Sequence, residues 1–319
     1  MTEAATDVRR PPFDPECWAE YEAMPYEMPR MSDAVLQAGR QQPEPSLADL
    51  SLGGAYEVSE VTANGVPLIV ARPSGVEGVV PVLYLLHPGG MILGGRASGA
   101  LPVLPLLAQP LGMAVVSAGY RLAPDVRAPQ LAEDAYTGLS WLAENAADLG
   151  LDAERLILMG ISGGGGLAAS CGLMARDRGG PSVLAQLLVY PMLDDRNDTV
   201  SSSQMAGAGI WHQADNEYAW RQVLGERHGS DDVTYLDAAA RAEDVSGLPP
   251  TFLDAGSCET FRDEIVDFAS RIWRAGGTAD LHVWGGGFHG FDLVAPEAPL
   301  GAASWQTKRD WVSRQLARV

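Results

Sequence analysis

The stretch from Leu156 to Gly164, Leu-Ile-Leu-Met-Gly-Ile-Ser-Gly-Gly, decides the fold. Its four leading apolar residues predict a buried strand, and the glycine-rich run after them opens a helical pattern. G-x-S-x-G between a strand and a helix is typical of a nucleophilic serine on a sharp, strained turn, where the two glycines avoid side-chain collisions. The positive N-terminal end of the following helix would favour an oxyanion. The stretch therefore predicts Ser162 as a nucleophile.

The same glycines also fit a second motif. Gly163, Gly165 and Ala168 match the dinucleotide-binding fingerprint G-x-G-x-x-A. That fingerprint usually lies in the first strand–helix unit of a sheet, with an acidic residue at the end of the next strand. Here it falls in the middle of the predicted sheet, and the next strand ends at Tyr190-Pro191. The nucleophile interpretation is therefore favoured over a cofactor site.

On both sides of this stretch, short apolar runs alternate with longer helical patterns. This alternation predicts crossover connections and a mostly parallel sheet with helices on both faces. Asn64-Gly65 between two strand patterns predicts an antiparallel hairpin at the start of the sheet. The predicted strands cover residues 56–62, 66–71, 79–86, 113–117, 156–159, 187–189, 251–253 and 281–284, and the predicted helices cover 128–145, 163–175, 261–275 and 302–317.

Residues 192–245 interrupt the alternation with a long, polar, helix-like segment. A connection of this length inside a compact sheet is usually functional or a subdomain. We interpret it as a cap insertion over the carboxyl edge of the sheet, joined there by residues 1–50 as the N-terminal part of the cap. Residues 51–191 and 246–319 then form the two parts of the catalytic domain. The alternative is a surface excursion without a role.

The predicted strand 79–86 ends in His87-Pro88-Gly89-Gly90-Met91. Consecutive glycines let backbone N–H groups turn toward one point, where they can hold the negative charge of a tetrahedral intermediate. We expect Gly89 and Gly90 to act as oxyanion-hole donors with Gly163 as the third, whereas Pro88 has no N–H to donate. His87 is expected to steady this loop. The alternative is an ordinary loop rich in proline and glycine.

A histidine follows the last predicted strand, in the run Gly285-Gly286-Gly287-Phe288-His289. We expect this glycine-rich run to form a loop that brings His289 to the serine as general base and then general acid. The other histidines fit less well, because His212 and His228 lie in the presumed cap and His282 lies within a strand.

The third catalytic residue should follow the predicted strand 251–253. Glu259 lies at the end of that loop, whereas Asp254 comes too early and Asp263 lies in the next helix. Ser162, Glu259 and His289 then occur in the chain order expected of a nucleophile-elbow hydrolase. A carboxylate at Glu259 would hold the imidazole in the right tautomer and stabilise its charged form.

Ordered motifs over roughly residues 80–295 resemble those of the bacterial hormone-sensitive-lipase-like esterases. The sequence departs from the family pattern at four positions. It has Pro88 for glycine, Ile161 for an acidic residue and Gly163 for alanine. It also has Glu259 for aspartate. The matching motifs are His87-Pro88-Gly89-Gly90 for H-G-G-G, Tyr120–Asp125 for Y-R-L-A-P-E, Gly160–Gly164 for G-D-S-A-G, Glu259–Glu264 for D-P-L-R-D-E and His289–Phe291 for H-G-F.

The resemblance implies an α/β-hydrolase fold with a mostly parallel central sheet of about eight strands, helices on both faces and a helical cap. It implies a serine carboxylesterase for short- to medium-chain acyl esters that works through an acyl-enzyme, without a metal or an organic cofactor, in a family whose members are often homodimers. The same triad would serve an amide, a formamide, a lactone or a carbamate. Plant gibberellin receptors resemble this family but lack the catalytic histidine, so His289 favours an enzyme over a receptor.

Four aromatic residues of the presumed cap, Trp18, Tyr21, Trp211 and Trp220, are candidates for an apolar pocket around the acyl or alcohol group. The alternative is that they are simply packed, as most aromatic side chains are.

The composition limits the partners. The formal net charge of −19 is spread along the chain, and Lys308 is the only lysine. Such a surface repels nucleic acid and anionic lipid, so we expect a small-molecule ester as the partner and neither nucleic acid nor a membrane. Three widely spaced cysteines suggest neither a disulfide framework nor a zinc site. Residues 1–10 contain acidic residues and no apolar run, so we expect no signal peptide and a cytoplasmic location.

Overall fold

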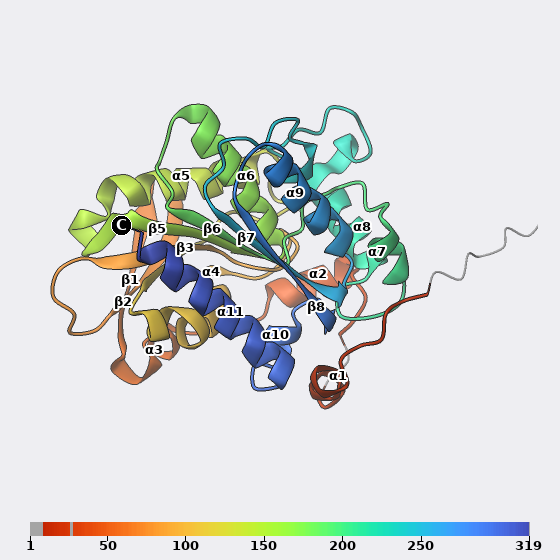
Figure 1. The fold of residues 1–319 in the computed structure, drawn as a ribbon, viewed down its shortest axis with the longest axis horizontal. Coiled ribbons are helices and arrows are strands. Elements are labelled where there is room, and N and C mark those ends of the chain that lie inside the picture. Colours follow the sequence, from red (N-terminus) through yellow and green to blue (C-terminus); the bar gives the residue numbers. More distant parts are fainter. Residues whose placement is uncertain (1–8, 26–27, 319) are drawn as a thin grey trace, which may run out of the picture.

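The computed structural model of the chain describes residues 9–25 and 28–318 (Figure 1). Within them, eight strands form one sheet in the order β1-β2-β4-β3-β5-β6-β7-β8. β2 is antiparallel to both β1 and β4, and all other neighbours are parallel, so the predicted mixed, mostly parallel sheet is confirmed. The strands are β1 (Tyr56–Ala63), β2 (Val66–Pro73), β3 (Val80–Leu86), β4 (Ala114–Ala118), β5 (Leu151–Ile161), β6 (Ala185–Val189), β7 (Thr251–Cys258) and β8 (Ala279–Phe288).

Helices cover both faces of this sheet, as expected (Figure 1). One face carries α4 (Arg96–Val103) and α11 (Pro299–Leu316), and the other carries α5 (Gln130–Asn145), α6 (Gly163–Arg178) and α9 (Arg262–Arg274). α4 was not predicted from the sequence, because Gly99 and Pro102 within it are poor helix formers. The shorter helices are α1 (Pro15–Glu22), α2 (Asp33–Arg40), α3 (Leu47–Leu50), α7 (Val200–Gln204), α8 (Gln213–Leu224) and α10 (Phe291–Val294).

The central strands explain why the functional loops meet. β4 and β6 are buried at every position and β3 at all but one, as expected of strands covered on both faces. Because β3, β5, β6, β7 and β8 are parallel, the turns that follow them lie at one edge of the sheet. In open α/β sheets, this carboxyl edge is where ligands bind.

The N-terminal segment and the insertion between β6 and β7 contact each other. Asp215, in the first turn of α8, accepts hydrogen bonds from the Met31 backbone N–H and from the Arg30 guanidinium, both at 2.7 Å. The Tyr218 hydroxyl of α8 donates to Asp33 of α2 at 2.7 Å. Segments nearly 200 residues apart in the chain are therefore tied together by polar contacts.

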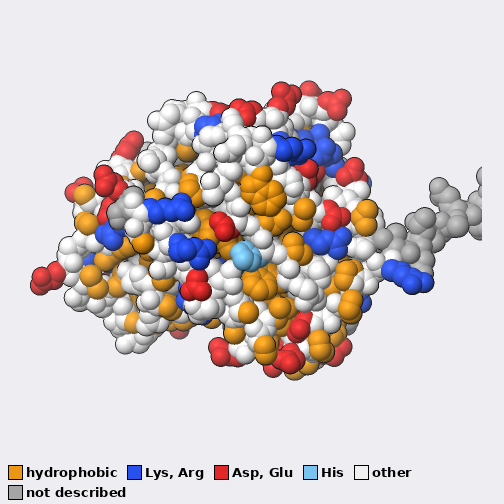
Figure 2. Space-filling model, in the orientation of Figure 1, with side chains coloured by type: hydrophobic (Ala, Val, Ile, Leu, Met, Phe, Trp, Pro, Cys, Tyr) orange, Lys and Arg blue, Asp and Glu red, His pale blue; other side chains and the backbone are white. Residues whose placement is uncertain are grey.

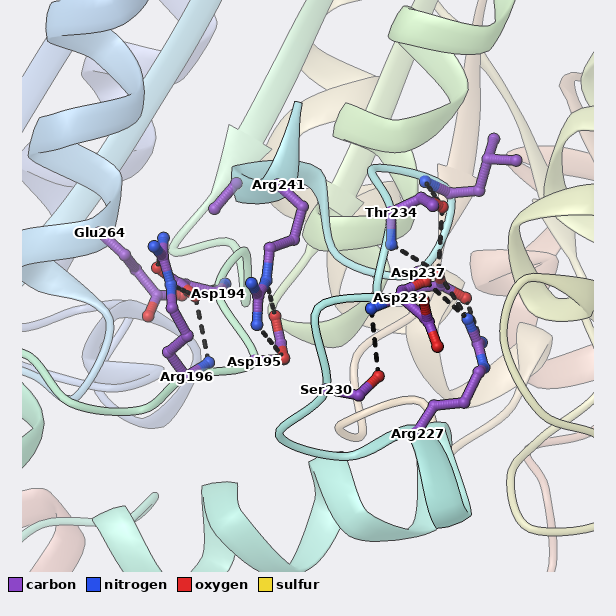
Figure 3. Close-up of polar contacts among 12 residues, drawn as sticks. Asp194, Asp195, Arg196, Arg227, Ser230, Asp232, Thr234, Asp237, Arg241 and Glu264 are labelled. Atoms are coloured by element: carbon purple, nitrogen blue, oxygen red, sulfur yellow. Dashed lines mark hydrogen bonds and ion pairs between the residues drawn. The ribbon is translucent and has the colours of Figure 1, made fainter. Parts of the chain in front are cut away.

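Ion pairs stabilise the conformation of the insertion between β6 and β7. Figure 3 shows Arg241 reaching Asp195 and Arg227 reaching Asp237, two carboxylates that are buried. Each guanidinium binds both oxygens of its aspartate, a geometry that fixes orientation as well as distance. The two ends of the insertion, near residues 195 and 241, are thereby joined to each other.

The run Gly285–Gly287 is part of β8 and not a loop after it, so this expectation was wrong. The glycines allow other backbones to come close on both sides of the strand. A Cβ on Gly286 would lie 2.6 Å from the Asp14 backbone nitrogen, and a Cβ on Gly256 of β7 would lie 2.1 Å from the Gly287 carbonyl oxygen. The strand therefore continues to Phe288 and delivers His289 directly.

None of the helices in residues 9–25 and 28–318 is both long and apolar enough to cross a lipid bilayer.

Candidate active site

Ser162 lies on the sharp turn between β5 and α6, with φ +57° and ψ −122°. Its side chain is only 4% exposed. A Cβ on Gly160 would lie 2.2 Å from the Gly164 carbonyl oxygen, and a Cβ on Gly164 would lie 2.2 Å from the Leu86 carbonyl oxygen. Glycine is therefore required on both sides of the serine, which accounts for the G-x-S-x-G spacing.

The structure brings Ser162, His289 and Glu259 into one hydrogen-bonded chain. The His289 Nε2 lies 3.0 Å from the Ser162 Oγ, and the His289 Nδ1 lies 2.6 Å from the Glu259 Oε1. Because a carboxylate can only accept, Nδ1 donates to Glu259 and Nε2 is left to accept the serine proton. These distances are those of a nucleophile within reach of a base that a third group orients.

Glu259 follows β7 and is fixed on its other oxygen as well. Its Oε2 accepts a hydrogen bond from the Gly256 backbone N–H at 2.9 Å. Burial raises the pKa of the Glu259 carboxyl above its ordinary value, although the neighbouring His289 opposes the shift. Asp254 lies within β7 and Asp263 within α9, so neither occupies this position.

Aromatic rings enclose the imidazole of His289. Tyr190 meets it edge to face, with ring centroids 4.9 Å apart, and Phe261 does so at 5.2 Å. Trp211 lies tilted at 6.4 Å. The imidazole is thus buried and surrounded by aromatic rings. Two of these rings, Tyr190 and Phe261, meet it in the edge-to-face arrangement that aromatic pairs favour.

Gly89, Gly90 and Gly163 lie beside the serine turn. A Cβ on Gly163 would lie 2.9 Å from the Gly90 Cα, so the loop after β3 reaches the start of α6. Gly89 and Gly90 have φ of +124° and +58°, conformations that favour glycine. In residues 9–25 and 28–318, the backbone N–H groups of these three glycines donate to no protein acceptor. They are therefore available to an oxygen atom of a ligand.

His87 supports this loop. It is buried, it stacks on Tyr120 with centroids 4.2 Å apart, and its Nδ1 donates to the Pro88 carbonyl at 2.9 Å. The Tyr120 hydroxyl donates to the His87 carbonyl at 2.7 Å. Burial lowers the pKa of His87 to about 4, so its imidazole is neutral at physiological pH. These contacts agree with the expected structural role of His87.

A cavity of about 320 Å³ opens beside Ser162 and His289. Its wall is mostly apolar and comes from six separate parts of the chain. None of these wall residues was predicted to line a pocket, since single apolar residues in short helices and loops give no pattern. The other described lining residues are Met24, Met28, Pro88, Ile161, Tyr190, Ile210, Gly290, Leu293 and Val294.

The four predicted pocket aromatics lie in different places. Trp211 contacts the loop after β3, since a Cβ on Gly90 would lie 2.8 Å from its ring. Trp220 is fully buried, and none of the four aromatics is among the described residues that line the cavity. Trp18 and Tyr21 instead pack against Phe288, with ring centroids 5.4 Å and 6.0 Å away, and so support the strand end that carries His289.

In the described part of the chain, no group of three or more histidine, cysteine or carboxylate side chains is arranged to hold a metal ion.

Known proteins share this fold and sequence. A family model described as alpha/beta hydrolase fold matches residues 82–293, two thirds of the chain. The chain belongs to this family, in its hormone-sensitive-lipase-like branch. The predicted α/β-hydrolase fold is therefore confirmed. The matched region contains Ser162, Glu259 and His289, the three residues that are joined by hydrogen bonds.

Several relatives of this hydrolase are named for ester hydrolysis. Carboxylesterase NlhH of Mycobacterium tuberculosis is 34% identical over 238 residues, which cover 73% of this chain and 74% of that protein. Ethyl acetate hydrolase of Pseudomonas putida is 30% identical over 267 residues, covering 81% and 79%. The solved structure of a bacterial heroin esterase, at 33% identity, superposes with a TM-score of 0.85 over 95% of this chain and 98% of that one.

Proposed function

We propose that this protein is a serine carboxylesterase in which Ser162 is the nucleophile, His289 the general base and Glu259 the residue that orients the base. The observation that carries the proposal is the geometry of the three side chains, with His289 3.0 Å from the serine and 2.6 Å from the glutamate. The names of the relatives support the same class of reaction, hydrolysis of a carboxylic ester.

In the first half of the reaction, the Ser162 oxygen attacks the ester carbonyl while its proton passes to His289 Nε2. The negative charge that develops on the carbonyl oxygen is stabilised by the N–H groups of Gly89, Gly90 and Gly163, which have no protein acceptor in the described structure. His289 then gives its proton to the alcohol oxygen as the C–O bond breaks, and the acyl group remains on Ser162.

In the second half, water takes the place of the alcohol. His289 removes a proton from the water, the hydroxide oxygen attacks the acyl carbonyl, and the Ser162 oxygen leaves with the proton. Glu259 stays ionised and stabilises the imidazolium that forms in each half. Hydrogen bonds from the Gly256 backbone N–H and from the His289 imidazole keep the glutamate in place throughout.

The substrate is a short- to medium-chain acyl ester. The cavity beside Ser162 measures about 320 Å³ and is lined mostly by apolar side chains, which suits a small uncharged acyl or alcohol group. Trp211, which lies against both Gly90 and His289, borders the reacting centre. Trp18, Tyr21 and Trp220, like Trp211, are not among the described residues that line the cavity.

The first prediction tests the nucleophile and the bond type. Ser162→Ala should lower kcat for a nitrophenyl ester by roughly 10⁶-fold, as in a comparable serine enzyme. Ser170→Ala, a buried serine within α6, is a matched control that should retain activity. Near-normal turnover by the Ser162 variant would overturn the assignment. A chain-length series of nitrophenyl esters, run beside amides and lactones, measures the acyl limit and the preferred bond.

The cap is also part of the proposal. Residues 1–50 and 192–245 are proposed to cover the carboxyl edge of a catalytic domain that comprises residues 51–191 and 246–319, where residues 1–8, 26, 27 and 319 lie outside the described part of the chain. Polar contacts between Asp215 and residues 30 and 31 support a joint cap. Met24, Met28 and Ile210 from these two segments line the cavity, which gives the cap a role in substrate selection.

The protein is also proposed to form homodimers through β8. This strand lies at the edge of the sheet, and Val283 on it and Trp273 nearby are 45% and 47% exposed. Figure 2 shows apolar side chains over β8, between α9 and α11. An unpaired, partly apolar edge strand is suited to pair with a second copy. Light scattering on the wild type and on Val283→Lys tests this, since a dimer that persists in the variant would exclude this interface.

A cytoplasmic location completes the proposal. All three cysteines are free and buried in the structure, as suits a reducing compartment. Cell fractionation of the source organism tests this expectation.

A further inference from the structure

A buried charged cluster lies behind His289. Lys308 of α11 is 0% exposed, and its ammonium lies 2.5 Å from Asp254 Oδ2 and 2.8 Å from Asp292 Oδ2. The Ser304 hydroxyl donates to the same oxygen of Asp292 at 2.8 Å. Buried charges contribute little to stability even when paired, so a cluster of this kind calls for another explanation.

Tyr190 connects the cluster to the end of β6. Its hydroxyl donates to Asp292 Oδ1 at 3.2 Å, and its backbone N–H lies 3.2 Å from Asp254 Oδ1. Both aspartates that pair with Lys308 therefore also accept from Tyr190. The tyrosine is completely enclosed, so its ring has one position relative to the sheet.

The ring of Tyr190 meets the imidazole of His289 edge to face, 4.9 Å away and at 71°. Its backbone has φ +32°, a conformation that costs energy for a residue other than glycine. Strained residues persist only where their surroundings enforce them, and they gather at functional sites. Tyr190 also lines the substrate cavity together with Ser162.

We propose that Tyr190 is a positioning residue for His289 and that the Lys308 cluster fixes Tyr190 through Asp292. The inference rests on the proposed function. Asp292 belongs to α10, the short helix that begins two residues after His289. The cluster therefore fixes both the Tyr190 ring, which contacts the imidazole, and the backbone segment next to His289. The ring then limits how far the imidazole can rotate away from Ser162.

Tyr190→Phe removes only the hydrogen bond to Asp292 and leaves the ring in the cavity wall. We expect kcat for a nitrophenyl ester to fall about tenfold, because small misplacements of a catalytic group are costly, while KM stays near the wild-type value. Tyr84→Phe is the matched control. Tyr84 is also fully buried, and its hydroxyl donates to the Ala135 carbonyl at 2.7 Å, away from the site. This control should lower Tm to a similar extent and leave kcat unchanged.

A spectroscopic readout separates positioning from stability. The proton on His289 Nδ1, shared with Glu259 at 2.6 Å, should give a far-downfield proton NMR signal. In Tyr190→Phe this signal should shift or broaden, whereas in Tyr84→Phe it should match the wild type. Lys308→Met should have the same effect as Tyr190→Phe if that variant folds, and Tyr190→Phe decides the question if it does not.

The outcomes are distinguishable. A Tyr190→Phe enzyme with wild-type kcat and an unchanged Nδ1 signal, beside an inactive Ser162→Ala variant, would overturn the inference and leave the proposed function standing. A change in KM alone would show that Tyr190 only lines the cavity, and it would likewise overturn the inference. Activity that survives in Ser162→Ala would overturn the proposed function, and the NMR signal would still report on the position of His289.

Discussion

Gly163, at the first position of α6, is where the oxyanion loop comes closest to the serine turn. A Cβ at this position would lie 2.7 Å from the Met91 nitrogen and 2.9 Å from the Gly90 Cα. The resembling family carries alanine at this position, so the loop after β3 approaches the nucleophile more closely here than that side chain would permit.

We expect Gly163→Ala to push the loop away from the developing oxyanion and to lower kcat about tenfold, since complete removal of one donor costs roughly 10²–10³-fold. Steady-state kinetics with a nitrophenyl ester measure the effect. Gly285→Ala is the control, because a Cβ there would meet nothing within 4 Å. Equal kcat in both variants would show that the loop adapts.

Glu259 and Asp263 lie in one sequence motif but have different neighbours. Glu259 accepts from the imidazole, whereas Asp263 accepts from the Ser201 backbone N–H at 2.8 Å. We expect Glu259→Gln to lower kcat roughly 10⁴-fold, as when the triad carboxylate of a comparable enzyme becomes an amide and favours the wrong tautomer. Asp263→Asn should retain most activity. The reverse order in the same kinetic assay would mean that the wrong acid was assigned.

At the residue scale, sequence pattern predicted the groups that act through fixed local geometry. Ser162 could be predicted because its turn demands flanking glycines, and His289 because it follows the last strand. Lys308 could not be related to the site, since its partners at 254 and 292 come together only through folding. Tyr190 directly follows β6 at the carboxyl edge of the sheet, and this position in the sequence could have indicated a role at the site.

At the scale of elements, the chain leaving β6 is fixed to α9 by a buried carboxyl group. Glu264 of α9 accepts from the backbone N–H groups of Leu193 and Asp194, at 2.7 Å and 3.2 Å. Burial raises the pKa of Glu264 well above its ordinary value of 4.5, so the folded state binds this proton more tightly than the unfolded state does. Stability from this group is present below pH 4.5 and is lost as the pH rises through the folded pKa.

We therefore expect Glu264→Gln, which carries no charge, to gain Tm relative to the wild type as the pH rises from about 5 to about 8. Thermal unfolding followed by circular dichroism measures the difference. Glu133→Gln should show a Tm difference from the wild type that stays nearly constant over this range, because Arg178 holds the pKa of Glu133 below its ordinary value of 4.5, and the carboxyl is ionised in both the folded and the unfolded state above about pH 5. A Tm difference for Glu264→Gln that does not change with pH would contradict the prediction.

The eight strands and the four long helices α5, α6, α9 and α11 could be predicted from periodicity, whereas the full extent of β8 and the presence of α4 could not. The glycines at 285–287 suggested a loop, yet they extend β8 because the backbones of Asp14 and Gly256 need the space that side chains would fill. α4 could not be predicted because it contains a glycine and a proline, which have low helix propensity. Its packing against β3 and β4 outweighs that low propensity.

At the scale of the whole molecule, the alternation of strand and helix was enough to predict the architecture, because crossover connections allow few arrangements. The cavity was beyond prediction, since its wall joins residues near 24, 161, 210 and 293. Under the proposed function, the substrate range would therefore depend on contacts between segments that are distant in sequence, whereas the reaction would depend on short motifs.

Lys308 has a practical consequence for following the unfolding of this protein. It is the chain's only lysine, and its ammonium is fully enclosed, so the folded molecule presents no lysine amine to solvent. A succinimidyl reagent should leave residue 308 unmodified until α11 separates from the sheet. The mass of the peptide that contains this residue, followed across a urea series, would then report directly on opening of the region behind the imidazole.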